Sequence, residues 1–194
     1  MSVHLVLCHP LADSLNAHLA TTVEAAIAAR GLSVDRLDLY ASGFEPALTI
    51  EERRAYYGAI GPENSPSDLQ QRLASAEHLV LVFPTWWFAP PAMLKGWFER
   101  VWAPGIAFEQ GTPIRPLLGN LKSIVVVTTL GSPFWFDTII ARQPVKNTLR
   151  TGLFTACAPQ AEFRMLSLHS AENVDAARLA RFEARIDRAI ARLM

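Results

Sequence analysis

Several features that mark secreted, membrane-spanning or nucleic-acid-binding proteins are absent from this sequence of 194 residues. Its two cysteines, Cys8 and Cys157, are too few for a disulfide framework and match no zinc-site spacing. Acidic and basic residues number 18 each, so no basic excess indicates nucleic acid. No run of about 20 apolar residues is present to cross a bilayer, and the apolar run at residues 5–8 is too short for a signal peptide. We therefore expect a soluble, cytoplasmic protein with no metal site, no nucleic-acid partner and no membrane insertion.

The pattern of apolar residues predicts a single α/β domain over residues 1–194. About half of the sequence, 51%, is hydrophobic, which is enough to fill one core. Short apolar runs predict strands at residues 3–8, 33–38, 79–83, 123–129 and 162–168. Amphipathic segments between them predict helices at residues 14–30, 50–57, 67–76, 90–102, 145–156 and 173–193. Residues 103–118 are expected to form a loop, and Gly31 to follow the first helix as its C′ residue.

Alternation of strands and helices predicts a three-layer, doubly wound sandwich. The expected sheet has five parallel strands in the order 2-1-3-4-5, which is the flavodoxin-like arrangement. In such folds ligands bind beyond the carboxyl ends of the strands, where the strand order reverses. This rule directs attention to the loops that follow the first, third and fourth strands.

The loop after the first strand has polar residues where a helix begins. Ser14 and Asn16 lie at the expected helix N-terminus, where free backbone N–H groups and the helix dipole attract anions. His9 is placed to contact a phosphate or the edge of a ring. Alternatively, Ser14 or Asp13 is only an N-cap and His9 only a surface residue. No glycine-rich phosphate loop is present.

The loop after the third strand carries three consecutive aromatic residues, Trp86, Trp87 and Phe88. Aromatic rings at the mouth of a buried strand suit stacking on a flat ring system. The alternative is that Trp87 and Phe88 cover the core beneath the next helix. The switch-point rule favours the ligand over the core packing.

The loop after the fourth strand combines small residues with a second aromatic cluster. Thr128, Thr129 and Gly131 let the backbone approach a ligand closely, and residues 134–136 read Phe-Trp-Phe. These aromatics alternatively form an apolar patch that meets a partner chain. Together the three loops predict a site for a planar cofactor that bears phosphate.

Several motifs in the sequence resemble those of the NAD(P)H dehydrogenase (quinone) family of flavodoxin-like flavoproteins. The run from Pro84 to Val101 carries the most specific part of this resemblance. The other matching segments are His9 with residues 14–16, residues 38–41 with residues 44–46, and residues 128–132.

The resemblance implies a homodimer that binds a flavin noncovalently, either FAD or FMN, with NAD(P)H as co-substrate. It implies hydride transfer from NAD(P)H through the flavin to a quinone or similar small acceptor. The residues that it implies for the phosphate and adenosine side are His9, Ser14, Leu15 and Asn16. Those that it implies for the flavin ring are Pro84, Thr85, Trp86, Trp87, Phe88, Thr128, Thr129, Leu130 and Gly131. A short match at residues 175–178 extends to the adenosine end.

The sequence departs from the family pattern after the fourth strand. Leu130 stands where well-known quinone reductases have glycine, and the tyrosine and histidine that stabilise reduced flavin there are missing. By spacing, those two positions fall near Phe136 and Arg142, which we take as the catalytic candidates. Arg142 would supply positive charge to an anionic reduced flavin.

Two other kinds of function remain open at this point. One is a flavodoxin-type electron carrier, against which the zero net charge argues, because such carriers dock through an acidic surface. The other is a regulatory flavin-binding subunit of a membrane antiporter, which the missing tyrosine and histidine favour.

Overall fold

A five-stranded parallel sheet forms the centre of the computed structural model, which describes residues 2–56, 58 and 67–193. Its strands are β1 (Ser2–Leu7), β2 (Ser33–Asp38), β3 (His78–Pro84), β6 (Ser123–Thr129) and β7 (Glu162–Leu168). They are ordered β2-β1-β3-β6-β7, so the predicted 2-1-3-4-5 topology is confirmed. The segment expected to be a loop contains a small antiparallel pair, β4 (Phe108–Glu109) and β5 (Arg115–Pro116).

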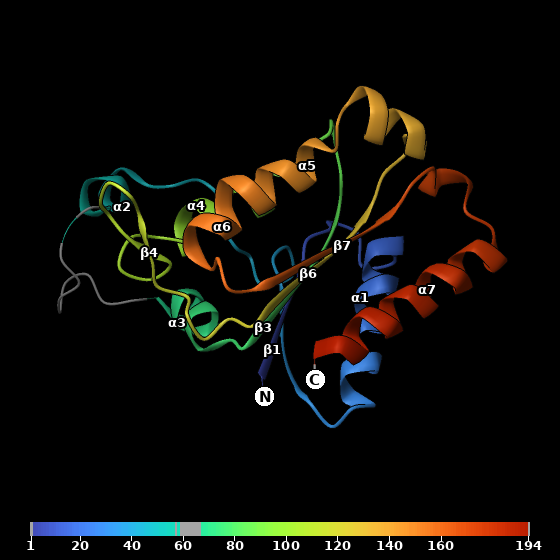
Figure 1. Ribbon diagram of the computed structural model, residues 1–194, viewed down its shortest axis with the longest axis horizontal. Coiled ribbons are helices and arrows are strands. Elements are labelled where there is room, and N and C mark those ends of the chain that lie inside the picture. The colour runs from blue at the N-terminus through green and yellow to red at the C-terminus, as the bar shows by residue number, and fades with distance from the viewer. Residues whose placement is uncertain (1, 57, 59–66, 194) are drawn as a thin grey trace.

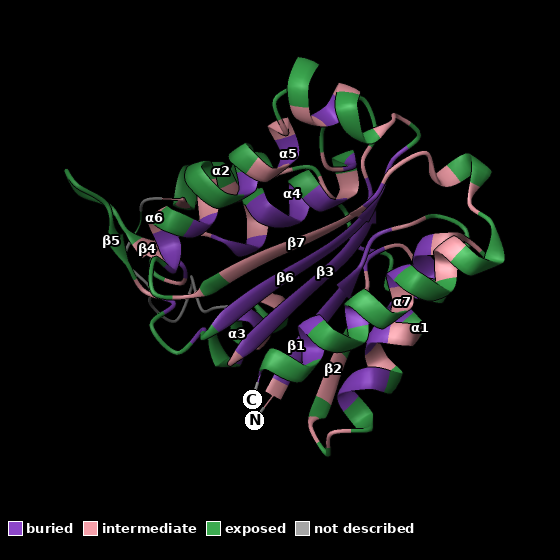
Figure 2. Cartoon of the chain, turned by 45° about the vertical axis from the view of Figure 1, so that its right-hand side comes forward, coloured by how far each residue is buried: buried purple, intermediate pink, exposed green. Residues whose placement is uncertain are grey.

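Helices cover both faces of this sheet (Figure 1). Helices α1 (Leu15–Ala28) and α7 (Ala176–Ile190) lie on one face, and α3 (Asp68–Ser75) and α4 (Ala92–Val101) on the other. Alternate residues of β3 pack into the two layers: Leu81 and Phe83 toward α4, and Val82 toward α1. The central strands are therefore buried throughout, as Figure 2 shows, which explains their continuous apolarity.

The helix boundaries depend on caps that the sequence partly reveals. Helix α2 (Ile50–Ala55) begins with a capping box between Thr49 and Glu52, whereas position 57 of the predicted helix lies outside the described residues. Helix α4 begins at Ala92, because the backbone of Pro91 is extended at the N-cap position. Helix α1 ends before a C-cap at Ala29. Gly31 (φ 69°) is therefore the C″ residue, one position beyond the C′ position that was predicted for it.

The segment between β6 and β7 differs most from expectation. Instead of one α-helix over residues 145–156, it forms α5 (Pro144–Asn147), a π-helical stretch (Thr148–Phe154) and α6 (Thr155–Cys157). A further π-helical turn, Phe136–Ile140, lies where no element was predicted. The last predicted helix is shorter than expected, since 3-10 turns occupy residues 171–173 and 191–193. Because π-turns often occur at functional sites, this segment merits inspection.

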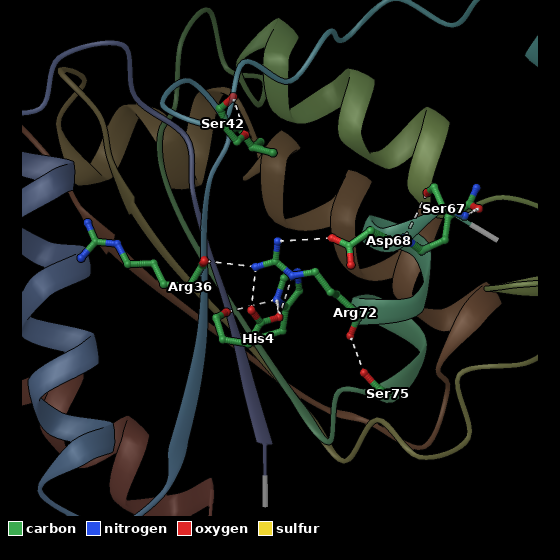
Figure 3. A network of polar contacts seen from close by, with 10 residues as sticks. His4, Arg36, Ser42, Ser67, Asp68, Arg72 and Ser75 are labelled. Atoms are coloured by element: carbon green, nitrogen blue, oxygen red, sulfur yellow. Dashed lines mark hydrogen bonds and ion pairs between the residues drawn. The ribbon is translucent and has the colours of Figure 1, made fainter.

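A polar network closes the amino end of the sheet (Figure 3). The buried His4 places its Nδ1 2.8 Å from Oδ2 of Asp35, which in turn forms two hydrogen bonds with Arg72. Arg72 also donates to the carbonyl of Arg36. Burial lowers the pKa of His4, so this imidazole is neutral and Asp35 is ion-paired to Arg72 alone.

Reactive thiols, metal-binding clusters and membrane-spanning helices are not found among the described residues. Cys8 and Cys157 are buried and unpaired, and burial raises their thiol pKa values to about 12 and about 11. Among these same residues, no three histidine, cysteine or acidic side chains are grouped to hold a metal ion. None of the helices within the described ranges has the length and apolarity needed to cross a bilayer.

Candidate functional site

Backbone hydrogen bonds join the three loops that the sequence singled out. The amide of Cys8 donates to Val82 (2.9 Å), and the amide of Thr85 donates to Thr129 (2.7 Å). The parallel register pairs Phe83 with Thr128, so β3 and β6 end at the same level. The carboxyl ends of β1, β3 and β6 therefore form one continuous rim.

The start of α1 presents free backbone donors at this rim. The hydroxyl of Ser14 accepts from the amide of Ala17 (3.1 Å), so Ser14 is the N-cap, as the alternative reading held. Within the described part of the chain, the amides of Leu15 and Asn16 have no hydrogen-bond acceptor. In the tautomer protonated at Nε2, Nδ1 of His9 accepts from the amide of Leu11 (3.1 Å) and Nε2 is a donor; in the other tautomer Nδ1 donates to the carbonyl of Leu11 (3.3 Å). With Nε2 protonated, this arrangement suits an anion, because three N–H donors and a helix dipole are available.

Side-chain hydrogen bonds fix the polar residues of the rim. Asn16, almost fully buried, donates from Nδ2 to Oγ1 of Thr129 (2.9 Å), and the hydroxyls of Thr85 and Thr128 lie 2.9 Å apart. Oδ1 of Asn16 and Oγ of Ser132 are buried with no partner among the described residues. Because a buried polar atom without a partner is costly, both indicate a missing polar group at this rim.

A tight turn displays the aromatic residues after β3. Trp86 and Ala89 exchange two backbone hydrogen bonds (3.1 and 3.0 Å), and the residues between them both have left-handed backbones, Trp87 at φ 50° and Phe88 at φ 57°. This is a type I′ geometry, which favours asparagine and glycine and strains bulky residues. Trp87 is nonetheless 98% exposed, so burial within this chain does not offset the strain. Strain of this kind is concentrated at binding sites.

Further rings line the same rim. His9 and Trp86 meet edge to face with centroids 5.8 Å apart, and Phe88 lies 5.6 Å from Phe136. Phe134 packs edge-on against His169 at 5.4 Å. The structure thus brings together the aromatic residues predicted in two separate loops.

A pocket opens between the ends of β3, β6 and β7. Three of the predicted residues, Thr85, Thr128 and Leu130, line it. The sequence analysis did not identify its other polar lining residues, which are Asp137, Gln143, Lys146 and Ser167. Gln143 accepts from Nζ of Lys146 (3.2 Å), which holds this ammonium at the pocket.

The structure treats the two catalytic candidates differently. Phe136 lies against Phe88 at the rim. Arg142, however, is exposed and does not line the pocket, where Lys146 supplies the positive charge. The reason is local: Arg142 and Gln143 have left-handed backbones (φ 59° and 52°), and Asn147 fixes this bend by donating to the carbonyl of Arg142 (2.7 Å).

A histidine–aspartate hydrogen bond beside the pocket was also not predicted from the sequence. Asp137, which lines the pocket, lies 3.1 Å through Oδ2 from Nε2 of His169, and both side chains are nearly buried. Arg178 donates to the carbonyl of His169 and holds the loop after β7 in place. The two partners are 32 residues apart, so no local pattern indicated their contact. A histidine therefore lies beside the pocket after all, but it comes from the loop after β7 and not from the loop after β6.

Comparison with known proteins finds relatives among oxidoreductases. An uncharacterised NAD(P)H oxidoreductase of Escherichia coli (strain K12), YcaK, is 39% identical over 111 residues, 56% of this chain and 56% of that protein. NAD(P)H dehydrogenase (quinone) 1 of Rattus norvegicus is 31% identical over 147 residues, 66% of this chain and 53% of that protein. The chain thus aligns with about half the length of these relatives.

Solved structures share the same architecture over the whole chain. The NAD(P)H:quinone oxidoreductase from Methanothermobacter marburgensis has a TM-score of 0.83 at 23% identity, covering 100% of this chain and 96% of that one. An FMN-dependent NADH-azoreductase from Bacillus anthracis, solved in complex with FMN, has a TM-score of 0.79 at 15% identity and covers 100% and 99%. At these identities the likeness shows the fold. A family model described as the flavodoxin-like fold matches residues 1–193, and the chain therefore belongs to this family.

Proposed function

We propose that this protein is a flavin-dependent oxidoreductase that transfers a hydride from NAD(P)H to a quinone or a similar small acceptor. The observation that carries the proposal is the rim itself, where free amides, unpartnered polar atoms and a strained aromatic turn meet at the switch point of the sheet. The names of the relatives, NAD(P)H oxidoreductase and quinone dehydrogenase, agree with it.

The residues present fit a flavin nucleotide. The amides of Leu15 and Asn16 and the Nε2 of His9 suit a phosphate, and the buried Oδ1 of Asn16 suits a hydroxyl or N–H of the ligand. The exposed ring of Trp87 and the half-buried ring of Phe88 suit a flat heterocycle. FAD and FMN share the ring and the first phosphate, and both satisfy these groups.

A bound flavin would supply the redox chemistry, which is transfer of a hydride (one proton with two electrons) from NAD(P)H to the acceptor. The chain supplies position and electrostatics. The Thr85–Thr128 hydroxyl pair and the Thr85–Thr129 backbone bond hold the pocket edge, and Trp87 and Phe88 exclude water from one side. Lys146 would bring a positive charge to the pocket, where it could stabilise developing negative charge, and Asp137 would orient His169 beside it.

We include a homodimer and a reducing, cytoplasmic location in this proposal. Two observations support the homodimer: Trp87 is exposed, and an apolar groove between α4 and the π-helical stretch is lined by Phe88, Phe98 and Leu153. A second copy covering these surfaces would bury apolar area that a monomer leaves in water. The two unpaired thiols support the location.

The deciding experiment is spectroscopy of the purified protein. We expect absorbance in the flavin bands, release of FAD or FMN identified by mass, bleaching by NAD(P)H and recovery on adding a quinone. Trp87→Ala should weaken flavin binding about tenfold, since one aromatic stacking contact is worth about 0.5–1.5 kcal/mol. The control is Ile114→Ala, which removes an exposed apolar side chain from the β4–β5 segment.

Two results would reject this proposal. A colourless protein that binds neither added FAD nor FMN would exclude a flavin function of any kind. A flavoprotein that NAD(P)H does not bleach would instead be an electron carrier or a regulatory subunit.

A further inference from the structure

Helix α7 divides its charges between two flanks. Its acidic residues Glu183 and Asp187 face α1, where they pair with His18 (2.6 Å) and Arg30 (2.8 Å). The buried residues Phe182, Ile186 and Ile190 separate this flank from the other. Both carboxylates are therefore engaged by α1 and face away from the opposite flank.

That opposite flank carries a row of arginines at positions 178, 181, 185, 188 and 192. Spacings of three and four residues place them along one side of a helix. Of these, Arg181, Arg185, Arg188 and Arg192 form no ion pair with any residue that the structure describes. Arg185 lies over the ring of Phe182 (5.3 Å), which aligns its guanidinium along the helix surface. In a chain of zero net charge, this row is a local concentration of positive charge.

The arginine row borders a groove along the edge of the sheet. Strand β7 is the last strand, and in Figure 1 it runs in front of the others with α7 on one side and α6 on the other. Two adjoining hollows share Arg185: one is bounded by Arg164, Arg188 and Arg192 over Met165 and Leu166, the other by Arg181 and His169. Arg164 is ion-paired with Glu162, so the unpaired positive charge of the groove comes from α7, and β7 has no strand partner on its outer side among the described residues.

We propose that this groove, the α7–β7 groove, binds an extended acidic segment of a partner protein. The row from Arg178 to Arg192 covers 14 residues, or about 21 Å at 1.5 Å per residue, which matches about six residues of extended chain. The β7 edge offers backbone hydrogen bonds to such a chain, as in strand addition. Carboxylates at alternate positions would then meet the guanidiniums, which bind carboxylates with two parallel N–H donors.

Other anions fit the groove less well. A lipid surface needs an exposed convex face, whereas the apolar Leu166 lies in a hollow flanked by arginines. Single-stranded nucleic acid is bound by stacking bases on aromatic rings, and Phe134 and Phe182 are the aromatic residues that line these hollows. Phe182 is buried, so only one ring is accessible. A single phosphate would use only a part of the row.

The groove is also separate from the candidate cofactor site in its lower half. Arg164 and Leu166 lie in the middle of β7, on the amino side of Ser167, and do not line the cofactor pocket, whereas Met165 lines both that pocket and the groove. The side chains of Arg164 and Leu166 face α7, while Met165 packs in the opposite core. Charge reversal on α7 therefore tests the groove without altering residues that we place at the cofactor.

The test uses a fluorescein-labelled heptapeptide of alternating glutamate and valine, titrated with the full-length protein and followed by fluorescence anisotropy. We expect binding that weakens as salt rises, and a loss of about tenfold or more in Arg185→Glu/Arg188→Glu, since several partly exposed ion pairs each contribute up to about 1 kcal/mol. The matched control is Arg54→Glu/Arg150→Glu, which makes the same charge change at two exposed arginines outside the groove. Its affinity should stay within twofold of the unaltered protein.

Equal loss of affinity in both double variants would overturn the proposal, because it would show attraction to overall charge. So would preferential binding of inorganic tripolyphosphate, of phosphatidylglycerol vesicles or of an oligothymidylate in the same assay. Circular dichroism checks that the variants fold. If the glutamate pair does not fold, Arg185→Gln/Arg188→Gln removes the charges without introducing repulsion and should still lower the affinity.

Discussion

Every residue of β3 is buried from His78 to Pro84, whereas Trp87, just beyond the end of this strand, is 98% exposed. In the strand, side-chain chemistry matches the local structure: apolar residues lie in extended backbone between two layers. In the turn it does not, because two bulky aromatics adopt a backbone that suits asparagine and glycine. The contrast shows that stability resides in the interior, while the rim gives up local stability to display particular groups.

The largest expected loss of stability comes from a substitution that disturbs packing in the interior. A Cβ on Gly96 of α4 would lie 2.2 Å from the carbonyl oxygen of Pro46, so α4 packs directly on that backbone. Gly96→Ala should lower the free energy of unfolding by about 3 kcal/mol or more, as overpacking against backbone does. The measurement is urea unfolding followed by circular dichroism.

Gly152→Ala is its control, because a Cβ there would meet nothing within 4 Å and the residue is helical. Its stability should change by less than about 1 kcal/mol, with alanine favoured by helix propensity. Similar losses in both variants would show that the contact with Pro46 is not the cause.

A smaller expected effect is a loss of stability at acidic pH, caused by two buried histidines in the interior. His4 and His78 have buried Nε2 atoms with no partner among the described residues, and burial lowers both pKa values below the ordinary 6.5. Below pH 6.5 the unfolded chain binds protons that the folded protein does not. Their contribution to stability is therefore complete above pH 6.5 and is lost as the pH falls toward the folded-state pKa values, at up to about 1.4 kcal/mol per pH unit for each histidine.

Urea unfolding at pH 7, 6 and 5 measures this loss. His4→Gln should reduce the slope of stability against pH, because it removes one of the two histidines whose pKa is lowered by burial. A rise in stability on acidification would contradict the neutral state of the two buried histidines, His4 and His78.

At the rim we expect a substitution to raise the free energy of unfolding and not to lower it. Trp87→Asn should raise the free energy of unfolding by about 1 kcal/mol, because asparagine accepts the left-handed backbone and little packing is lost. The same change should weaken flavin binding. Ile114→Asn makes the same replacement at another exposed apolar residue, without a left-handed backbone, and should bring no gain. A destabilised Trp87→Asn protein would show that the indole packs in the native state.

The smallest expected effect is an absence of reaction. Cys8 and Cys157 have thiol pKa values of about 12 and about 11, so iodoacetamide at pH 8 should label neither in the folded protein and both in urea. Mass spectrometry measures the labelling. Rapid labelling without urea would mean that the interior opens far more readily than its packing implies.

The sequence was informative where one residue pattern has one physical reading. The runs at β3 and β6 predict buried parallel strands, and the topology places their loops together. The sequence was uninformative where a residue adopts a backbone conformation that its residue type disfavours. Trp87, Phe88, Arg142 and Gln143 are all left-handed without being glycine or asparagine, so neither the strained turn nor the outward position of Arg142 was predictable.

Tertiary contacts account for what else was missed at the site. Asp137 and His169 meet only because β6 and β7 are neighbours and a π-helical turn directs Asp137 inward. The predicted helix at residues 145–156 has the right position but the wrong form, because π-helical hydrogen bonding leaves no signal in apolar periodicity. Lys146, and not Arg142, lines the pocket, because the left-handed backbone at Arg142 and Gln143 leaves the Arg142 side chain exposed.

The turn between Trp86 and Ala89 has a consequence for the rate of ligand capture. Two backbone hydrogen bonds close it, and the neighbouring Thr85 amide bonds to Thr129 of β6, so the backbone that carries the indole cannot move away without breaking them. A ligand arriving at this edge meets a ring already in place, and little conformational entropy is lost on association. Capture should therefore follow a single kinetic phase that scales with ligand concentration, with no slow rearrangement after the encounter.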